Sequence, residues 1–251
     1  MSQTLVRPAS LKGERFYVEG PEAHHLLRVL RRKVGDPVVL FDGVQRRCRG
    51  VIESIHPDIP SAEGRITADL PLSADRYRIR LFQGLPKGSK IDFVIEKAVE
   101  LGAESIHPFT SERGQVVVDA DGAVSKYARW TRLAEAAAKQ CERADVPDLS
   151  APAALDSLEG ELSAGSTLIF SLSPAAQPLR QTLRSDSGHL LKDNSDIINA
   201  VVGPESGFSP AEEAKLVSWG GRLVSIGARV LRTETAGLAA LAILHYELNQ
   251  R

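Results

Sequence analysis

Hydrophobic and polar positions follow two different rhythms along the 251 residues. Up to about residue 72 the apolar positions form short runs interrupted by turn signals, a pattern that is typical of β-strands. These runs lie at 15–18, 37–41, 49–55 and 64–70, with Asp42-Gly43 as a hairpin signal and one helical pattern at 22–30. We therefore predict a small, mostly β barrel for residues 1–72.

After Pro71 the pattern changes to alternating strands and helices. Continuous apolar runs at 167–172 and 197–202 are typical of parallel strands that are covered on both faces. Further strands are expected at 77–82 and 104–109, and helices at 89–101, 124–141 and 233–248. The pattern predicts an α/β domain with a parallel sheet over residues 73–251, in which 149–166 forms a surface connection.

Composition narrows the range of functions without selecting one. The chain is 43% hydrophobic and 25% charged, as globular proteins usually are, and its net charge of −1 argues against binding nucleic acid by overall charge. No apolar run approaches the roughly 20 residues that span a bilayer, and the first residues lack a secretory pattern. Cys48 and Cys141 lie far apart without a CxxC motif, so neither a metal site nor a disulfide framework is indicated. We expect a cytoplasmic protein without membrane contact.

The most informative stretch is VGPESGFSPAEE, which follows the apolar run at 197–202. Gly203 and Gly207 frame a tight loop, and Ser209 and Glu212 form a capping box for a helix with Pro210 as its first residue. Open α/β sheets bind ligands at the carboxyl ends of their strands, so this loop is either a binding site or only a tight turn. Neither the lysine of a phosphate loop nor a GxGxxG motif is present.

A second glycine-bearing turn occurs in SIGARVLRTETAGLAAL, again between a strand and a helix. Arg232, Thr233 and Glu234 stand where this helix begins. A helix N-terminus favours Glu234 and disfavours Arg232 unless an anion lies nearby. The alternative is that Thr233 merely caps the helix and Arg229 is a solvated charge.

Together, the two loops resemble those of the small-subunit (16S) ribosomal RNA uracil-N3 methyltransferases, a branch of the knotted SPOUT methyltransferases. Similar stretches at 22–43, 90–109 and 136–149 extend the resemblance over nearly the whole chain. It implies a trefoil-knotted α/β domain that follows a PUA-like RNA-binding barrel. It also implies S-adenosylmethionine as the cofactor, 16S rRNA of the small ribosomal subunit as the substrate, and a homodimer.

The resemblance further implies which residues bind the cofactor, mostly through the backbone of three loops. These residues are Leu172, Gly203, Pro204, Glu205, Gly207, Ile226, Gly227 and Leu231. The sequence departs from the family at three places. Ser206 replaces a glycine, Ser173 replaces a histidine, and Asp145 stands where a second arginine usually follows Arg143.

Methylation at N3 requires that the uracil lose a proton and that the charge on its carbonyls be stabilised. We assign this stabilisation to Arg232, because its fixed donors suit a planar anion. Glu234 would orient Arg232 or accept the proton through water. Two alternatives stay open: a knotted methyltransferase that modifies ribose 2′-hydroxyls, and a non-enzymatic RNA-binding or ribosome-assembly factor.

A local excess of positive charge is the candidate RNA contact in the N-terminal part. A few well-placed cations suffice for phosphate binding, although a solvated helix end is the alternative. His24 and His25 are expected to pack or cap the helix rather than to bind metal. The RNA-binding candidates are Arg28, Arg31, Arg32, Lys33 and Arg143, with help from Arg46, Arg47 and Arg49.

Overall fold

The computed structural model describes residues 3–56, 58–72, 75–116, 118–184 and 196–249. The chain divides into two compact units. The N-terminal unit comprises residues 1–74 and 135–146, and the C-terminal unit comprises residues 75–134 and 147–251. Residues 135–146 thus pack with the N-terminal unit although they lie far from it in sequence.

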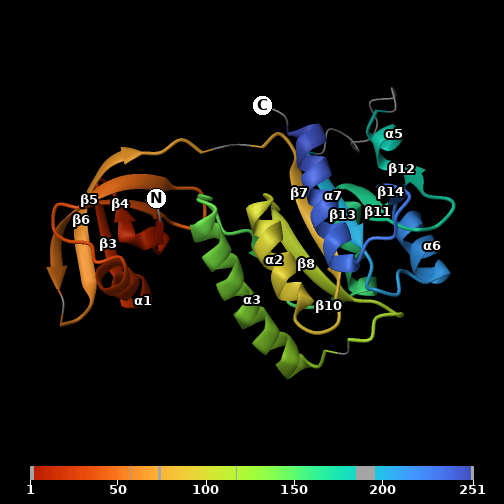
Figure 1. The fold of residues 1–251 in the computed structure, drawn as a ribbon, viewed down its shortest axis with the longest axis horizontal. Helices are drawn as coiled ribbons and strands as arrows, with labels where there is room; N and C mark the ends of the chain where they lie inside the picture. Colours follow the sequence, from red (N-terminus) through yellow and green to blue (C-terminus); the bar gives the residue numbers. More distant parts are fainter. Residues whose placement is uncertain (1–2, 57, 73–74, 117, 185–195, 250–251) are drawn as a thin grey trace. The chain divides into compact units, whose positions relative to one another are not determined.

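The N-terminal unit contains a six-stranded, mostly antiparallel sheet, in the order β1-β4-β5-β6-β3-β2 (Figure 1). Register shifts between β5 and β6 interrupt the ladder, as β-bulges do in curved sheets. The mostly β character predicted for this part is confirmed. The strands are β1 (Gln3–Leu5), β2 (Leu11–Lys12), β3 (Arg15–Glu19), β4 (Pro37–Phe41), β5 (Arg47–His56) and β6 (Ser61–Asp69).

The helix predicted at 22–30 is present as α1 (Gly20–His24), which continues into a π turn at His25–Val29. Ala23 and Leu26 are buried against the sheet. The side chain of Gln3 donates hydrogen bonds to the carbonyl oxygens of Ala138 and Arg143, at 3.1 and 2.5 Å. These bonds attach residues 135–146 to the first strand of the unit.

The C-terminal unit is built on an eight-stranded sheet whose described pairings are all parallel, as predicted. The strand order is β10-β8-β7-β13-β11-β14-β12, and β9 also pairs with β8. The strands are β7 (Arg78–Gly84), β8 (Ser105–Thr110), β9 (Asp148–Leu149), β10 (Ala153–Ala154), β11 (Ser166–Phe170), β12 (Gln177–Pro178), β13 (Ile197–Val202) and β14 (Arg222–Ser225).

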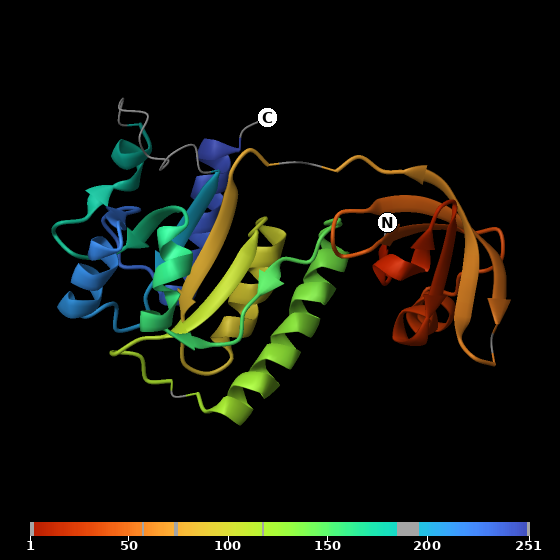
Figure 2. The same ribbon diagram turned by 180° about the vertical axis from the view of Figure 1, so that it is seen from behind.

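Helices cover both faces of this sheet. Figures 1 and 2 show α2 and α7 side by side on one face, where α7 packs on β7 and β13. On the other face, Phe82, Ile169 and Val201 form a core with Phe208 and Leu216. The remaining helices of the chain are α2 (Lys90–Glu100), α3 (Ala120–Gln140), α4 (Glu159–Ser163), α5 (Leu179–Arg184), α6 (Pro210–Ser218) and α7 (Thr233–Leu248). Residues 135–140 of α3 belong to the N-terminal unit.

The prediction of a surface connection at 149–166 is wrong. This segment contains β10, a 3-10 turn at Leu155–Leu158, and α4. Leu155, Leu158 and Leu162 are buried in the core described above. Their spacing of three and four residues is that of one helical face, so the signal was present but short.

Candidate active site

Three loops meet at the carboxyl ends of the neighbouring strands β13, β11 and β14. They enclose a cavity of about 620 Å³, within the range of about 300–1,000 Å³ that is usual for small-molecule sites. The cavity wall includes all eight residues that the resemblance implied for the cofactor: Leu172, Gly203, Pro204, Glu205, Gly207, Ile226, Gly227 and Leu231. Distant parts of the sequence therefore form one site.

The loop at 203–207 has the local structure that its sequence predicts. Ser209 caps α6, and Glu212 completes the capping box by accepting a hydrogen bond from the Ser209 backbone amide at 2.8 Å. Gly207 has a φ of 66°, which side chains disfavour. Ser206 is not among the described residues with positive φ, so replacing the usual glycine there imposes no backbone strain.

Glu205 lines the cavity, but its carboxylate is held from outside the loop. Its Oε1 accepts hydrogen bonds from the Lys87 backbone amide at 3.1 Å and from Lys90 Nζ at 3.0 Å. Partial burial acts to raise the pKa of the Glu205 carboxyl. The bonds from Lys90 and the backbone amides outweigh this effect, so the pKa lies below its ordinary value. Glu205 therefore anchors the loop as an anion.

The proposed catalytic pair lies at the start of α7. Arg232 is exposed, lines the cavity and makes no ion pair within the described part of the chain. Glu234 is largely buried and does not line the cavity. Its Oε2 lies 3.7 Å from Lys90 Nζ and has no hydrogen-bond partner among the described residues. Lys90, rather than Arg232, is thus the cation next to Glu234.

Three polar residues of the cavity were missed by sequence reasoning. Arg113, in the loop after β8, donates a hydrogen bond of 3.4 Å to the Phe208 carbonyl oxygen. The Ser171 hydroxyl bonds to the carboxylate of Glu213 on α6. A carboxylate at this position suits hydroxyl or ammonium groups of a ligand. Two of these residues could have been found from the sequence, because Ser171 precedes the predicted Leu172 and Glu213 follows the predicted capping box. No sequence pattern pointed to Arg113.

In the N-terminal unit, the cationic residues predicted to bind RNA differ in their solvent exposure and ion pairing. Arg28, Arg31 and Lys33 are exposed, and Arg32 is partly exposed.

By contrast, Arg46, Arg47 and Arg143 pair with neighbouring carboxylates. Arg46 pairs with Asp69, and Arg47 pairs with Glu142. Arg143 Nη2 lies 2.5 Å from Asp145 Oδ2, so an RNA contact by Arg143 requires this pair to open.

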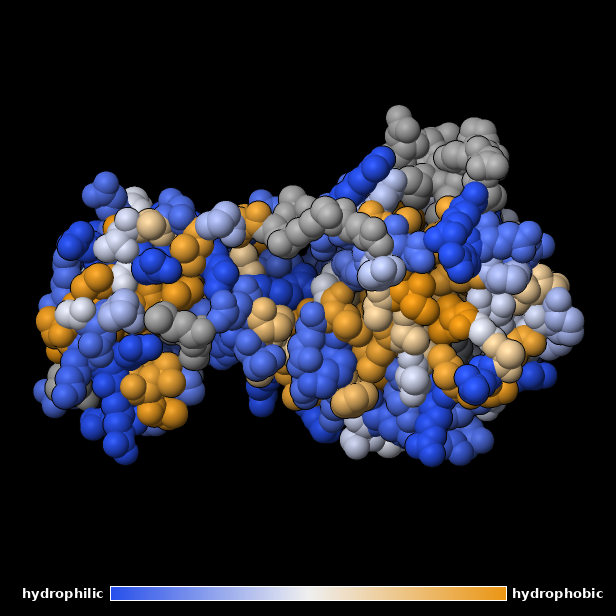
Figure 3. Space-filling view, turned by 45° about the horizontal axis from the view of Figure 1, so that its top comes forward, coloured by the Kyte–Doolittle hydropathy of each residue, from blue (hydrophilic) through white to orange (hydrophobic). Residues whose placement is uncertain are grey.

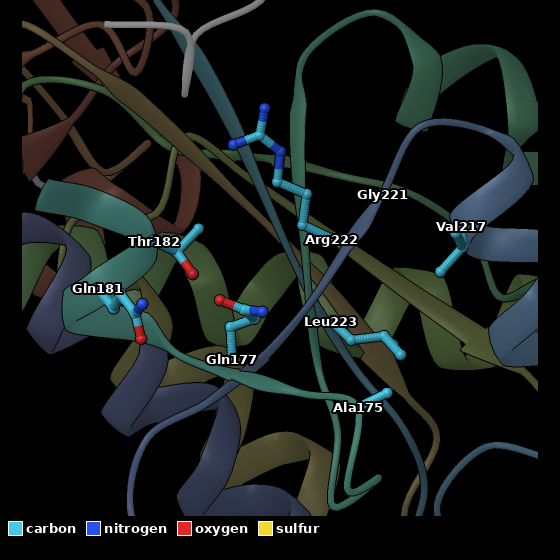
Figure 4. Close-up of a pocket in the computed structure, with 8 residues that line it drawn as sticks. All are labelled: Ala175, Gln177, Gln181, Thr182, Val217, Gly221, Arg222 and Leu223. Atoms are coloured by element: carbon cyan, nitrogen blue, oxygen red, sulfur yellow. The ribbon is translucent and has the colours of Figure 1, made fainter. Parts of the chain in front are cut away.

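Two other cavities lack the predicted cofactor residues. One of about 390 Å³ lies between the β12–α5 segment and the start of β14, where Figure 4 shows Gln177, Gln181 and Thr182 on one side and Arg222 and Leu223 on the other. The second, of about 660 Å³, belongs to the N-terminal unit. Its lining includes the acidic residues Glu19, Glu22, Asp42 and Glu135, which repel RNA phosphates.

Comparison with known proteins shows to which family the chain that forms this cavity belongs. Residues 73–245 match the RNA methyltransferase domain family, and residues 18–62 match the RNA methyltransferase PUA domain. The chain belongs to the RNA methyltransferase family. It is 30% identical to ribosomal RNA small subunit methyltransferase E of Bacillus subtilis (strain 168), over 92% of this chain and 90% of that protein. It is 32% identical to the protein of the same name from Mycobacterium tuberculosis (strain CDC 1551 / Oshkosh), over 89% of this chain and 83% of that protein.

Solved structures of relatives agree with this assignment. Ribosomal RNA small subunit methyltransferase E from Neisseria gonorrhoeae, bound to S-adenosylmethionine, has 28% identity and a TM-score of 0.80 over 98% of this chain and 97% of that one. A protein from Legionella pneumophila in complex with the same cofactor has 27% identity and a TM-score of 0.82 over 98% of both chains. The chain is therefore an S-adenosylmethionine-dependent RNA methyltransferase, and the predicted fold and cofactor are confirmed.

Two further observations concern the described residues alone. None of the helices there is both long and apolar enough to cross a bilayer. The same part of the chain holds no group of three or more histidine, cysteine, aspartate or glutamate residues placed to bind a metal ion.

Proposed function

We propose that this RNA methyltransferase transfers a methyl group to N3 of a uridine in 16S rRNA of the small ribosomal subunit, in the cytoplasm. The names of its relatives support the ribosomal substrate. The observation that carries the proposal is the cavity formed by three loops at neighbouring strand ends, with Arg232 in its wall. Arg232 and the loops proposed to bind the cofactor line one cavity, which supports the assignment of Arg232 as the cation that acts on the base.

The cavity fits the cofactor by size and chemistry. When bound, S-adenosylmethionine supplies a methyl group activated by a sulfonium. The glycine-bearing loops offer backbone groups to it at close range, and Phe170, Leu172 and Leu231 provide apolar wall. Glu213 and Ser171 offer the polar contacts that would orient the ligand.

Arg232 and Glu234 would then act on the uracil. The guanidinium of Arg232 donates to the carbonyl that gains charge as N3 loses its proton. Glu234 does not line the cavity and its unpaired Oε2 is buried, so its proposed role as proton acceptor requires that a water molecule reach this oxygen. Lys90 keeps a positive charge beside that carboxylate.

The test uses small ribosomal subunits from a strain that lacks this enzyme. We expect incubation with radiolabelled S-adenosylmethionine, followed by digestion, to give one labelled nucleoside, 3-methyluridine. Label on a ribose would instead identify a 2′-hydroxyl methyltransferase. An absence of both label and cofactor binding would identify an assembly factor that retains only the fold.

We propose that Arg28, Arg31, Arg32 and Lys33 bind RNA phosphates. The triple variant Arg28→Glu/Arg31→Glu/Lys33→Glu is expected to raise KM for small subunits about tenfold or more at physiological salt, because three phosphate contacts are lost. Its kcat is expected to change little, since these residues lie in the other unit from the cavity. Steady-state kinetics at several salt concentrations measure both effects. Lys12→Glu, an exposed charge in the same unit, is the control, and an unchanged KM in the triple variant would exclude this surface.

We also propose that the enzyme is a homodimer that α7 helps to form. Residues 236–244 of this helix are all apolar or glycine, so its middle is apolar on every side, as is typical of a helix that is covered on all sides. Yet Ile243 and Tyr246 remain 36% and 69% exposed. Figure 3 shows hydrophobic side chains gathered on this face of the C-terminal unit. Leu172 and Val230, in the cavity wall, are 70% and 75% exposed, which would place the cofactor site near the interface.

A further inference from the structure

Thr233 connects the two elements that the proposed reaction must bring together. It is buried at the first residue of α7, between Arg232 and Glu234. Its Oγ1 donates a hydrogen bond of 2.5 Å to the carbonyl oxygen of Gly203. Gly203 begins the loop at 203–207 in the cavity wall. The residue considered as a simple cap is therefore not the N-cap of α7, which is Arg232, and its hydroxyl bonds to the cofactor loop.

Gln83, near the end of β7, fixes the direction of that hydroxyl. Its Nε2 donates to Thr233 Oγ1 at 2.8 Å and to the Gly84 carbonyl oxygen at 3.1 Å. Both amide protons are thereby used, and the reverse amide orientation would place two acceptor oxygens together. Because Thr233 Oγ1 accepts from Gln83, its single proton remains for Gly203. We call this chain of hydrogen bonds the Thr233 clamp.

Stability alone does not explain a glutamine at this position. The Gln83 side chain is fully buried, and its Oε1 has no hydrogen-bond partner among the described residues. The helix leaves room for it only because residue 237 is glycine, where a Cβ would stand 2.4 Å from that oxygen. A methionine would fill similar space without leaving a buried acceptor unsatisfied. The polar group is therefore better explained by the bond that it makes to Thr233.

The backbone of β7 restrains the same loop. A Cβ at Gly84 would lie 2.5 Å from the Pro204 nitrogen and 2.7 Å from the Gly203 carbonyl carbon. The peptide between Gly203 and Pro204 therefore packs directly on β7. With the Thr233 hydroxyl bonded to the carbonyl oxygen of this peptide, the loop has little freedom to move relative to α7.

We propose that Thr233 and Gln83 are positioning residues for methyl transfer, which set the separation between the cofactor loop and the Arg232–Glu234 pair. This inference rests on the proposed function, in which that pair acts on the uracil. Methyl transfer depends on the alignment of the acceptor atom with the methyl carbon, and small displacements reduce its rate strongly. Loss of the clamp therefore lowers kcat more than it weakens the binding of either substrate.

The first test removes the hydroxyl and retains the shape of the side chain. Thr233→Val lowers kcat about tenfold or more, with KM for small subunits within about threefold of the wild type. Thr233→Ser, which keeps the hydroxyl, restores kcat to within about threefold. Gln83→Met lowers kcat as well, and the double variant loses little more than the larger single loss, because both residues act through one contact. Thr131→Val, which removes a hydroxyl bonded to the Tyr127 carbonyl within α3, is the matched control.

The second test does not depend on the RNA substrate. Amide hydrogen exchange in the segments 203–208 and 229–236 rises about fivefold or more in Thr233→Val, and returns towards the wild-type rate in Thr233→Ser. If the wild-type enzyme methylated no uridine, the proposed function would be wrong. The exchange rates would still show whether the Thr233 clamp restrains these segments. Wild-type kcat and exchange in Thr233→Val, or an equal loss in the serine variant, would overturn the inference.

Discussion

Replacing Arg232 by alanine is expected to lower kcat by a factor of about 10² to 10³, the usual effect of removing one donor to a developing oxyanion. Arg232 lines the cavity and is exposed, and in the described part of the chain no carboxylate pairs with it. Its charge is thus available to the uracil carbonyl. The affinity for S-adenosylmethionine, measured by calorimetry, should stay within about threefold, because the loss concerns the transition state.

The matched control for this substitution is Arg229→Ala. Arg229 lines the same cavity from the same loop and is also exposed. If net positive charge near the cavity were sufficient, the two variants would lose activity alike. We expect the loss only at Arg232, and Arg232→Lys should recover little of it, since a lysine lacks the fixed fork of donors. Wild-type turnover in Arg232→Ala would remove this residue from the mechanism.

The elements of the C-terminal unit were predictable because their signals are local. The apolar run at 197–202 predicted β13, and the capping box of Ser209 and Glu212 predicted where α6 begins. Parallel strands end on one edge of a sheet, so two glycine-bearing loops at strand ends were expected to meet there. The cavity contains both of them.

What could not be predicted depends on contacts between distant positions. Nothing in the local pattern indicates that Lys90 holds Glu205 and approaches Glu234. The three buried leucines between 155 and 162 span fewer than three helical turns, too few to give the clear periodicity that would have predicted this core segment.

Thr233 illustrates the same limit at the active site. Its position at a helix start predicts a cap, because threonine commonly serves there. The structure instead bonds its hydroxyl to Gly203, 30 positions earlier in the chain. Only the strand order, which places Gln83 beside Val202, brings the third member of the clamp within reach.

The double variant Ile243→Asp/Tyr246→Asp is expected to give a monomer with methyl transfer reduced about tenfold or more, as measured by sedimentation and by kinetics. Positions three apart lie on one face of a helix, and in a two-fold dimer each substitution acts twice. Four large apolar side chains would lose burial worth roughly 6 kcal/mol or more in total, which corresponds to about four decades in the dimer dissociation constant.

The same substitutions should leave the folding of each chain largely intact. Within a single chain Tyr246 is 69% exposed and Ile243 is 36% exposed, so the packing lost within the folded chain is confined mainly to the covered part of Ile243. Val124→Asp introduces the same charge at a 70% exposed valine on α3 and should keep both the dimer and the activity. A wild-type enzyme that sediments as a monomer, or a double variant that remains dimeric, would show that α7 is not the interface. If the double variant became a monomer with normal kcat, each cofactor site would be complete within one chain.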